Sequence, residues 1–189
     1  MSPPAEVAGL LLAAGAGRRF GGPKALAVLD GRPMVQDAVD VLLDGGCTPV
    51  VVVTGARGDE VAALLPDTVT AVHAEAWEQG MGESLRAGLA VIADTSAQSV
   101  LVHLVDLPDV GADVVTRMLS YAGPRALARA TFGGKPGHPV LFGRAWWPEL
   151  ATTLHGDRGA RDFLAGRADL VTVECGDIAT GCDVDYPPT

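Results

Sequence analysis

The sequence predicts an α/β fold with a doubly wound, mostly parallel sheet and helices on both faces. Three observations lead to this prediction: apolar runs rich in Val, Leu and Ile, amphipathic stretches between them, and a glycine-rich loop after the first run. Strands that are apolar at every position are typical of parallel sheets covered by helices on both faces. Because the chain has 189 residues, of which 48 % are hydrophobic, we expect one domain over residues 1–189.

Four apolar runs are expected to form strands, and the amphipathic segments between them are expected to form helices. The runs cover residues 7–13, 50–54, 69–73 and 100–105. In two intervening segments, apolar residues recur every three or four positions and therefore share one helical face. These residues are Val35, Val39 and Leu42 in the first segment and Leu85, Leu89 and Ile92 in the second. Both apolar faces are expected to pack against the sheet.

The last third of the chain is less regular than the rest. A short strand is expected at 140–142 and a helix around 160–164, among segments rich in Gly and Pro. The sequence has no internal repeat, low-complexity tract or linker, so this part is interpreted as an elaboration of the same domain.

Composition and charge argue against several classes of partner. The formal net charge of −9 would repel a nucleic-acid backbone. No apolar stretch approaches the roughly 18 residues that span a bilayer, and the first residues, M-S-P-P-A-E, lack a signal-peptide pattern. The cysteines Cys47, Cys175 and Cys182 are odd in number and lack C-x-x-C spacing. We therefore expect a cytoplasmic protein with neither nucleic acid nor membrane as a partner.

A glycine-rich loop, residues 14–24, follows the first predicted strand. Residues 10–24 read L-L-L-A-A-G-A-G-R-R-F-G-G-P-K. Glycines allow backbone N–H groups to approach phosphate oxygens, while Arg18, Arg19 and Lys24 supply charged donors. The spacing G-x-G-x-x-x-G differs from the dinucleotide motif, and Lys24 is followed by Ala25 instead of the Ser or Thr of a Walker loop. The loop is interpreted as a triphosphate site of another kind; a turn with exposed basic residues is the alternative.

Five further motifs follow the glycine-rich loop in order along the chain. They are W-E-Q-G-M-G-E-S-L at 77–85, V-D-L-P at 105–108, P-G-H-P-V-L-F at 136–142, H-G-D-R-G-A-R at 155–161 and D-V-D-Y-P at 183–187. Together with the loop, these motifs resemble the molybdenum-cofactor nucleotidyltransferases over nearly the whole chain. The G-M-G-x-S-L and G-H-P elements are more similar to the cytidylyltransferase branch than to the guanylyltransferase branch. The last motif departs from the usual D-x-D-T-P because Tyr186 stands in place of Thr.

The resemblance implies a nucleotide site with Mg²⁺ as cofactor. Its catalytic residues would be Arg18, Lys24 and Asp106. Asp106 follows a predicted strand, and in open α/β sheets ligands gather at the carboxyl ends of the strands, where a carboxylate can hold Mg²⁺. Asp185 is the implied second metal ligand, with Asp183 as the alternative. The residues implied to bind the nucleotide are Leu12, Ala13, Ala14, Gly15, Gly17, Arg18, Lys24, Gly82 and Ser84.

The resemblance also implies an acceptor site for molybdopterin. Its residues would be His138, His155, Asp157, Arg158 and Arg161, with the two arginines as candidates for the acceptor phosphate. Simpler roles remain open for some residues: Ser84 as a helix N-cap, Trp77 as a core residue instead of a base-stacking one, and the arginines as solvated surface groups. His103, inside a predicted strand, is interpreted as packed.

The activity implied by the resemblance is transfer of a nucleotidyl group, with CMP from CTP favoured, to the terminal phosphate of molybdopterin. Pyrophosphate would be released, and no protein nucleophile is required because the acceptor phosphate is already anionic. A molybdenum hydroxylase or dehydrogenase is a possible recipient of the product. The alternatives are a guanylyltransferase using GTP, a sugar-phosphate nucleotidyltransferase, a nicotinamide oxidoreductase, and a non-catalytic carrier of the molybdenum cofactor.

Overall fold

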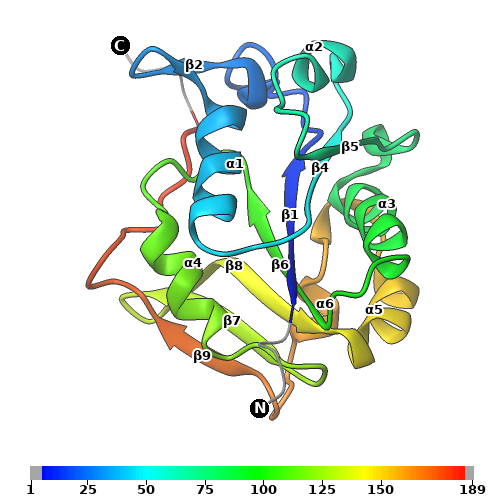
Figure 1. Cartoon of the computed structure of the whole chain (residues 1–189), viewed down its shortest axis with the longest axis vertical. Helices are drawn as coiled ribbons and strands as arrows, with labels where there is room; N and C mark the ends of the chain where they lie inside the picture. The colour runs from blue at the N-terminus through cyan, green and yellow to red at the C-terminus, as the bar shows by residue number, and fades with distance from the viewer. Residues whose placement is uncertain (1–5, 186–189) are drawn as a thin grey trace.

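A computed structural model of the protein, in which residues 6–185 are described, has a seven-stranded sheet with the strand order β5-β4-β1-β6-β8-β7-β9 (Figure 1). The strands of this sheet are β1 (Val7–Ala13), β4 (Val50–Thr54), β5 (Thr70–His73), β6 (Ser99–Leu104), β7 (Leu127–Phe132), β8 (Lys135–Gly143) and β9 (Val171–Glu174). A small hairpin of β2 (Val28–Leu29) and β3 (Arg32–Pro33) forms a separate two-stranded sheet.

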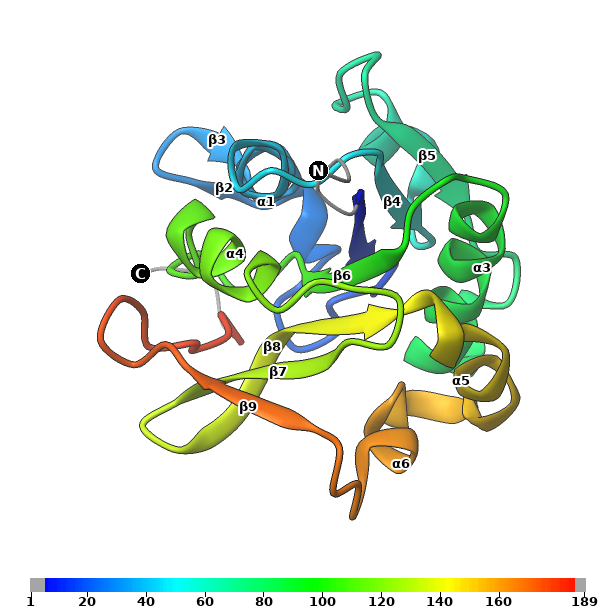
Figure 2. The ribbon, with the colours of Figure 1, turned by 60° about the horizontal axis from the view of Figure 1, so that its bottom comes forward.

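Helices cover both faces of the large sheet. They are α1 (Met34–Asp44), α2 (Gly58–Ala62), α3 (Met81–Ala93), α4 (Ala112–Leu119), α5 (Trp147–Thr153) and α6 (Arg161–Leu164), with short 3-10 turns η1 (Lys24–Leu26), η2 (Trp77–Gln79), η3 (Arg144–Trp146) and η4 (Gly156–Arg158). Figure 2 shows α1 and α4 on one side of the sheet and α3, α5 and α6 on the other. The predicted α/β fold class is therefore confirmed.

The four predicted apolar strands occupy the parallel half of the sheet. β1 pairs in parallel with β4 and with β6, and β4 pairs in parallel with β5. All seven residues of β1 and all five of β4 are buried, as expected for strands covered on both faces. The two segments with helical spacing are α1 and α3.

The last third of the chain adds the antiparallel part of the sheet. β8 pairs antiparallel with β6 and with β7, while β9 runs parallel to β7. The predicted strand at 140–142 is the end of the longer β8, whose first half is partly exposed. The sequence analysis missed β7 and β9 because Arg129 interrupts the apolar pattern of β7 and because β9 has only four residues, ending at Glu174.

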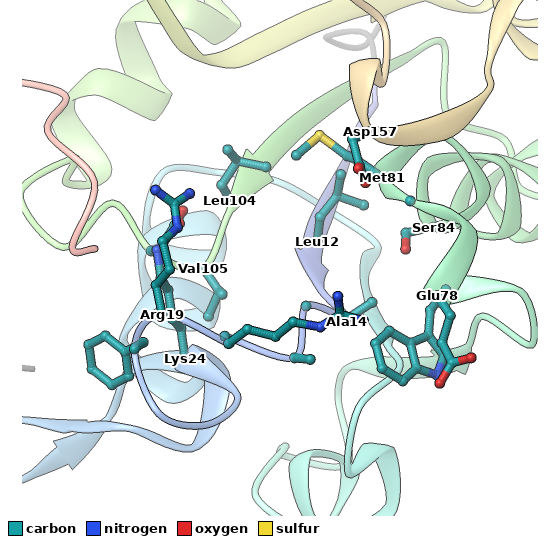
Figure 3. Close-up of a pocket in the computed structure, with 18 of the residues that line it drawn as sticks. Leu12, Ala14, Arg19, Lys24, Glu78, Met81, Ser84, Leu104, Val105 and Asp157 are labelled. Atoms are coloured by element: carbon teal, nitrogen blue, oxygen red, sulfur yellow. The ribbon is translucent and has the colours of Figure 1, made fainter. Parts of the chain in front are cut away.

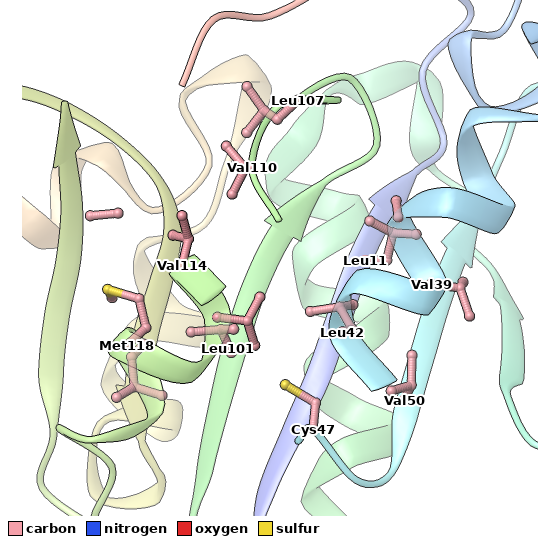
Figure 4. Close-up of a cluster of buried hydrophobic side chains, with 14 of the residues drawn as sticks. Leu11, Val39, Leu42, Cys47, Val50, Leu101, Leu107, Val110, Val114 and Met118 are labelled. Atoms are coloured by element: carbon pink, nitrogen blue, oxygen red, sulfur yellow. The ribbon is translucent and has the colours of Figure 1, made fainter. Parts of the chain in front are cut away.

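Two apolar layers hold the helices to the sheet. One contains Leu11, Leu42, Leu101 and Met118 and lies under α1 and α4 (Figure 4). The other lies under α3, α5 and α6 and contains, among others, Leu10, Leu85, Ile92, Phe142 and Leu150. Since strand residues alternate between the two faces, odd and even positions of β1 belong to different layers. Because β1 and β6 pair in parallel, their carboxyl ends lie next to each other in the sheet.

The structure also shows the state of His103, of the three cysteines and of the helices with respect to a membrane. His103 in β6 is 1 % exposed, which confirms that it is packed, and burial followed by the charge of His138 lowers its pKa to about 3. All three cysteines are free thiols. No helix among residues 6–185 is long and apolar enough to cross a bilayer.

Candidate active site

The glycine-rich loop leaves the carboxyl end of β1 and turns back on itself. Gly17 has a φ of +58°, and its carbonyl oxygen accepts hydrogen bonds from the N–H groups of Gly21 at 2.9 Å and Gly22 at 3.1 Å. A Cβ at Gly17 would collide with the Gly22 carbonyl, so both the φ angle and the close approach require glycine. The turn directs the chain into η1, which begins with Lys24.

A cleft of about 460 Å³ opens between the glycine-rich loop, the ends of β1 and β6, and the start of α3. Figure 3 shows Arg19 and Lys24 on one side of this cleft, Met81, Ser84 and Asp157 on the other, and Leu12 between them. The cleft is lined by Leu12, Ala14, Gly15, Ala16, Gly17, Arg18, Arg19, Phe20, Lys24, Trp77, Glu78, Gly80, Met81, Ser84, Leu104, Val105, Asp106, Asp157 and Asp185.

Lys24 connects the glycine-rich loop to two carboxylates inside the cleft. Its Nζ lies 2.8 Å from Oδ2 of Asp106 and 3.5 Å from Oδ1 of Asp185. Burial opposes the charge of Lys24, but its hydrogen bonds and charge interactions with Asp106 and Asp185 outweigh burial and raise the pKa of Lys24. Lys24 is therefore held as a cation between two anions.

Asp185 reaches the cleft because the segment 180–185 packs against the loop after β6. The N–H of Val184 donates to the carbonyl oxygen of Asp106 at 3.0 Å, and the N–H of Thr180 donates to Oδ2 of Asp109 at 2.6 Å. The segment is not a strand, and of the two candidate carboxylates only Asp185 lines the cleft. Asp183 is exposed and does not line the cleft. Tyr186 and Pro187 lie outside the described residues.

The first turn of α3 forms the opposite wall of the cleft. Gly80 is the N-cap of α3 and has a φ of +119°. Ser84 lies inside the helix, is 4 % exposed and lines the cleft, so the alternative in which Ser84 is the N-cap is wrong. The N-terminal end of a helix carries partial positive charge and attracts anions, so this wall and the basic loop across from it both favour an anionic ligand between them.

A second cavity of about 210 Å³ adjoins the cleft and shares Leu12, Met81, Leu104 and Asp157 with it. Its other lining residues are Leu85, Val102, Arg129, His138, Val140, Phe142, Arg158, Ala160, Arg161 and Leu164. Burial, followed by the charge of Arg129, lowers the pKa of His138 to about 4. The His138 imidazole is therefore neutral near pH 7. The charged residues that line the cavity are three arginines and one carboxylate, Asp157.

The donor set of the cleft fits a magnesium ion that is bound together with its substrate. Asp106 and Asp185 offer carboxylate oxygens, and no group of three or more His, Cys, Asp or Glu side chains suited to a metal occurs within residues 6–185. Mg²⁺ is commonly held by one or two carboxylates, with substrate phosphates and water completing its shell. The site therefore suits a metal that arrives with a nucleotide better than a permanently bound one.

Comparison with known proteins places this site in a family. A sequence profile for the MobA-like NTP transferase domain matches residues 9–172. The chain belongs to the MobA-like NTP transferase family. As a member of this family it is a nucleotidyltransferase, so the predicted enzyme class and the predicted family are both confirmed, and its substrate class is a nucleoside triphosphate. Asp185 lies beyond the matched range, in the segment that packs on Asp106.

Individual relatives of the MobA-like family resemble the chain along most of its length. Nicotine blue oxidoreductase of Paenarthrobacter nicotinovorans is 40 % identical over 191 residues, covering 95 % of this chain and 92 % of the relative. The crystal structure of Rv0371c from Mycobacterium tuberculosis H37Rv has a TM-score of 0.82 at 26 % identity, covering 97 % of this chain and 95 % of that one. A complex of Rv0371c with manganese has a TM-score of 0.79 at 25 % identity, covering 95 % and 94 % of the chains.

Most of the residues that the sequence singled out lie together in this MobA-like fold. Those that line the cleft are Leu12, Ala14, Gly15, Gly17, Arg18, Lys24, Ser84, Asp106, Asp157 and Asp185. Those that line the second cavity, in addition to Leu12 and Asp157, are His138, Arg158 and Arg161. The two predicted halves of the site are thus adjacent, and Asp157 lies at their junction.

Three predicted residues line neither cavity, and each has a physical reason. The Ala13 side chain is buried in the layer under α1 and α4. Gly82 is buried, and a Cβ on it would lie 2.7 Å from the backbone nitrogen of His155. His155 is exposed, and its Nε2 lies 3.6 Å from Oδ2 of Asp162. We therefore revise these assignments: Gly82 allows the turn around 155–158 to lie close to α3, and His155 is a surface residue outside both cavities.

Two further residues, Trp77 and Arg129, line the cavities besides the predicted site residues. Trp77 is partly buried, and a Cβ on Gly55 would lie 2.6 Å from its Cγ, yet Trp77 also lines the cleft. Its packing role is therefore confirmed, while stacking on a base stays a prediction. Arg129 in the second cavity was missed because β7 was not predicted. The signal that would have revealed it is a lone arginine within the otherwise uncharged strand L-A-R-A-T-F.

Proposed function

We propose that the protein transfers CMP from CTP, with Mg²⁺, to the terminal phosphate of molybdopterin. An oxygen of the acceptor phosphate attacks the α-phosphorus of CTP, and the bond from that phosphorus to the β-phosphate oxygen breaks. Pyrophosphate leaves, and a molybdopterin dinucleotide is formed. We also propose that residues 1–189 form one catalytic domain and that the protein works in the cytoplasm. A molybdenum hydroxylase or dehydrogenase would receive its product.

The observation that carries the proposal is the contact of Lys24 with both Asp106 and Asp185, at 2.8 and 3.5 Å. A cationic side chain and two carboxylates meet at the point where a triphosphate on the glycine-rich loop would present its phosphates. This combination suits phosphoryl transfer, in which catalysis consists of alignment and charge neutralisation.

The chain's own residues then have separate tasks. Backbone N–H groups of the glycine-rich loop and the exposed guanidinium of Arg18 hold the triphosphate. Asp106 and Asp185 would hold Mg²⁺, which withdraws negative charge from the reacting phosphate. Lys24, which lies beside both carboxylates, would supply positive charge to the phosphates that leave. Ser84 and the first turn of α3 position the nucleotide from the opposite wall.

The choice of CTP over GTP rests on the motifs at 77–85 and 136–142, which are more similar to the cytidylyltransferase branch. An assay of pyrophosphate release decides it: wild-type protein is incubated with molybdopterin, Mg²⁺ and each of CTP, GTP and ATP. We expect preferential turnover of CTP. Preferential turnover of GTP would instead assign the guanylyltransferase branch. Pyrophosphate release in a parallel assay, with a sugar phosphate in place of molybdopterin, would assign the alternative acceptor. Transfer of the cofactor to another protein without pyrophosphate release would assign a carrier.

Substitutions in the cleft test the metal-and-lysine mechanism. Asp106→Asn and Lys24→Ala are expected to lower kcat by about 100-fold or more while leaving the fold intact, because each removes a charge that acts on the transition state. Matched controls are Asp67→Asn and Lys135→Ala, two exposed positions outside the cleft. Near-normal turnover in both cleft variants would contradict the mechanism.

A second candidate activity comes from the 40 % identical relative, whose name states an oxidoreductase acting on nicotine blue. A nicotinamide dinucleotide would also place a pyrophosphate against backbone amides of a glycine-rich loop. This candidate predicts that NADH or NADPH is oxidised when nicotine blue is added. The loss of absorbance at 340 nm measures this oxidation. Oxidation that requires the pigment, without pyrophosphate release from any triphosphate, would favour it over nucleotidyl transfer.

A further inference from the structure

The loop after β6 holds segment 180–185 at both of its ends. At the start of the segment, Oδ2 of Asp109 accepts hydrogen bonds from the N–H of Thr180 at 2.6 Å and from the Thr180 hydroxyl at 2.5 Å. Near its end, the N–H of Val184 donates to the carbonyl oxygen of Asp106 at 3.0 Å. Asp106 lines the cleft, whereas Asp109 lies further along the same loop, outside the cleft.

The loop that carries Asp109 is fixed by the core on either side of this residue. Leu107 is 7 % exposed and Val110 is 1 % exposed, and both belong to the layer under α1 and α4. The N–H of Val110 also donates to the carbonyl oxygen of Leu107 at 3.2 Å. Asp109 itself is exposed, so its carboxylate is presented from a well-packed base. A residue held in this way can position the groups that bind to it.

The residues that precede segment 180–185 are held separately, by α4 and the core. Nη1 of Arg117 donates to Oδ1 of Asp177 at 2.6 Å, and its Nη2 donates to Oδ2 at 2.9 Å. Ile178 and Ala179 pack against the layer under α1 and α4. Figure 2 shows this part of the chain, in red, beside α4. These contacts bring the chain to Asp109, and the course of the segment beyond them depends on other contacts.

Thr180 uses its hydroxyl twice to form a turn at the start of the segment. Its Oγ1 donates to Asp109 and accepts a hydrogen bond from the N–H of Cys182 at 3.3 Å. Threonine hydroxyls that bind the backbone two residues further on stabilise turns of this kind. Gly181 between them has a φ of +66°, and a Cβ on it would collide with the Phe132 ring. The Asp109 carboxylate therefore orients the turn that leads the chain back to the cleft.

Asp185 depends on these backbone contacts for its place in the cleft. Its side chain is 39 % exposed, and its Oδ1 lies 3.5 Å from Nζ of Lys24. Ion pairs that are this long and partly exposed to water stabilise a structure little. By comparison, Asp106 is 21 % exposed and lies 2.8 Å from the same Nζ. The contact with Lys24 is therefore too weak to hold Asp185 beside Asp106 without the anchored backbone.

We propose that Asp109 is a positioning residue, which holds Thr180 and thereby keeps Asp185 beside Asp106. This inference rests on the proposed function, in which the carboxylates of Asp106 and Asp185 bind Mg²⁺ together with the nucleotide. Asp109 contacts neither of these carboxylates and acts through the backbone of segment 180–185. The loop after β6 would thus provide one metal ligand directly and set the position of the other.

Binding of CTP in the absence of an acceptor tests this inference without turnover. Isothermal titration gives the Kd for CTP with EDTA and with Mg²⁺, and the ratio of the two values measures the Mg²⁺ effect. Asp109→Ala is expected to lower this ratio by about tenfold, the loss typical of hydrogen bonds to a charged group, and to leave the Kd in EDTA unchanged. Asp109→Asn should retain most of the effect, because both hydrogen bonds end on one oxygen and an amide still offers one.

Two further variants separate positioning from a general effect on the fold. Asp185→Asn is expected to lower the Mg²⁺ effect as well, and the double variant with Asp109→Ala should lose no more than Asp185→Asn alone. Such non-additivity is expected when one residue acts only through the other. The matched control is Asp67→Ala, an exposed position outside the cleft, which should keep the wild-type ratio.

The inference and the proposed function fail in different ways. A wild-type Mg²⁺ effect in Asp109→Ala, an equal loss of CTP affinity in EDTA, or losses that add in the double variant would each overturn the inference alone. If wild-type protein shows no Mg²⁺ effect with CTP, GTP or ATP, the proposed metal site is wrong and the inference falls with it. If Asp109→Ala does not fold, Thr180→Val removes the hydroxyl from the other side of the contact, at an exposed position, and should lower the same ratio.

Discussion

The carboxylate of Glu174 anchors the turn between β7 and β8. Its Oε1 accepts hydrogen bonds from the N–H groups of Gly133 and Gly176, both at 2.8 Å. Its Oε2 accepts hydrogen bonds from the N–H of Gly134 at 3.0 Å and from Oγ1 of Thr131 at 2.9 Å. The backbone donors, led by Gly134, and then Thr131 lower the pKa of Glu174 to about 2. One residue thus connects β9 to the hairpin that carries Arg129.

This contact predicts a pH dependence of stability. Because the folded pKa of Glu174 lies below its ordinary value of 4.5, the stabilisation is complete above pH 4.5 and is lost as the pH falls toward 2. Glu174→Gln should lower the thermal midpoint at pH 7, since an amide N–H₂ would face backbone N–H donors. The difference between wild type and variant should shrink as the pH falls from 4.5 to 2.

Thermal unfolding at several pH values checks this prediction. The control is Glu75→Gln, at an exposed position for which no such donor set exists in residues 6–185. A difference between wild type and Glu174→Gln that stays constant between pH 5 and pH 2 would contradict the assigned role.

At the scale of elements, the start of α3 and the turn η4 fit together through glycine. A Cβ on Gly82 would lie 2.7 Å from the backbone nitrogen of His155, and a Cβ on Gly80 would collide with the Gly156 carbonyl group. Two motifs that are more than 70 residues apart, G-M-G at 80–82 and H-G-D at 155–157, are therefore in contact. This contact places Asp157 at the junction of the cleft and the second cavity.

Gly82→Ala is expected to be destabilising because backbone atoms, which cannot move as side chains do, occupy the space of the new methyl group. Overpacking of this kind costs about 1–3 kcal/mol, and each kcal/mol lowers the thermal midpoint by roughly 2–4 °C in a chain of this size. Gly123→Ala is the matched control, since nothing lies within 4 Å of its Cβ position. Equal midpoints for the two variants would show that η4 does not pack as described.

At the scale of the whole molecule, the layers of the fold determine which thiols are reactive. Cys47 and Cys175 are buried, whereas Cys182 is exposed in the segment that brings Asp185 to the cleft. Burial raises the pKa of Cys47 to about 12, and burial is also the main cause of the raised pKa of Cys175, so both thiols are protonated and shielded.

Titration with a thiol reagent such as DTNB should therefore detect one thiol in the native protein and three after unfolding. Cys182→Ser should abolish the native reaction and leave two thiols in denaturant. Rapid reaction of more than one thiol in the native protein would contradict the described packing of the sheet and its helices.

The sequence alone determined the parallel half of the fold and set its glycine-rich loop apart from two known motifs. β1 and most of β4 are apolar, α1 and α3 have helical spacing, and the spacing of the glycines and of Lys24 differs from the dinucleotide and Walker motifs. Lys24 could be named because it belongs to the glycine-rich loop, and Asp106 because it directly follows a predicted strand. These are local signals, which one segment of the chain carries by itself.

Only the tertiary structure decided how distant segments meet. It selected Asp185 over Asp183, because the segment 180–185 packs on Asp106 through the N–H of Val184. It shows that Ser84 lines the cleft and is not the N-cap of α3. It also shows that Gly82 packs against the turn around 155–158 and that Arg129 lines the second cavity. Each of these positions depends on contacts between segments that are far apart in the chain. The residue pattern within one segment does not show which distant segment will pack against it.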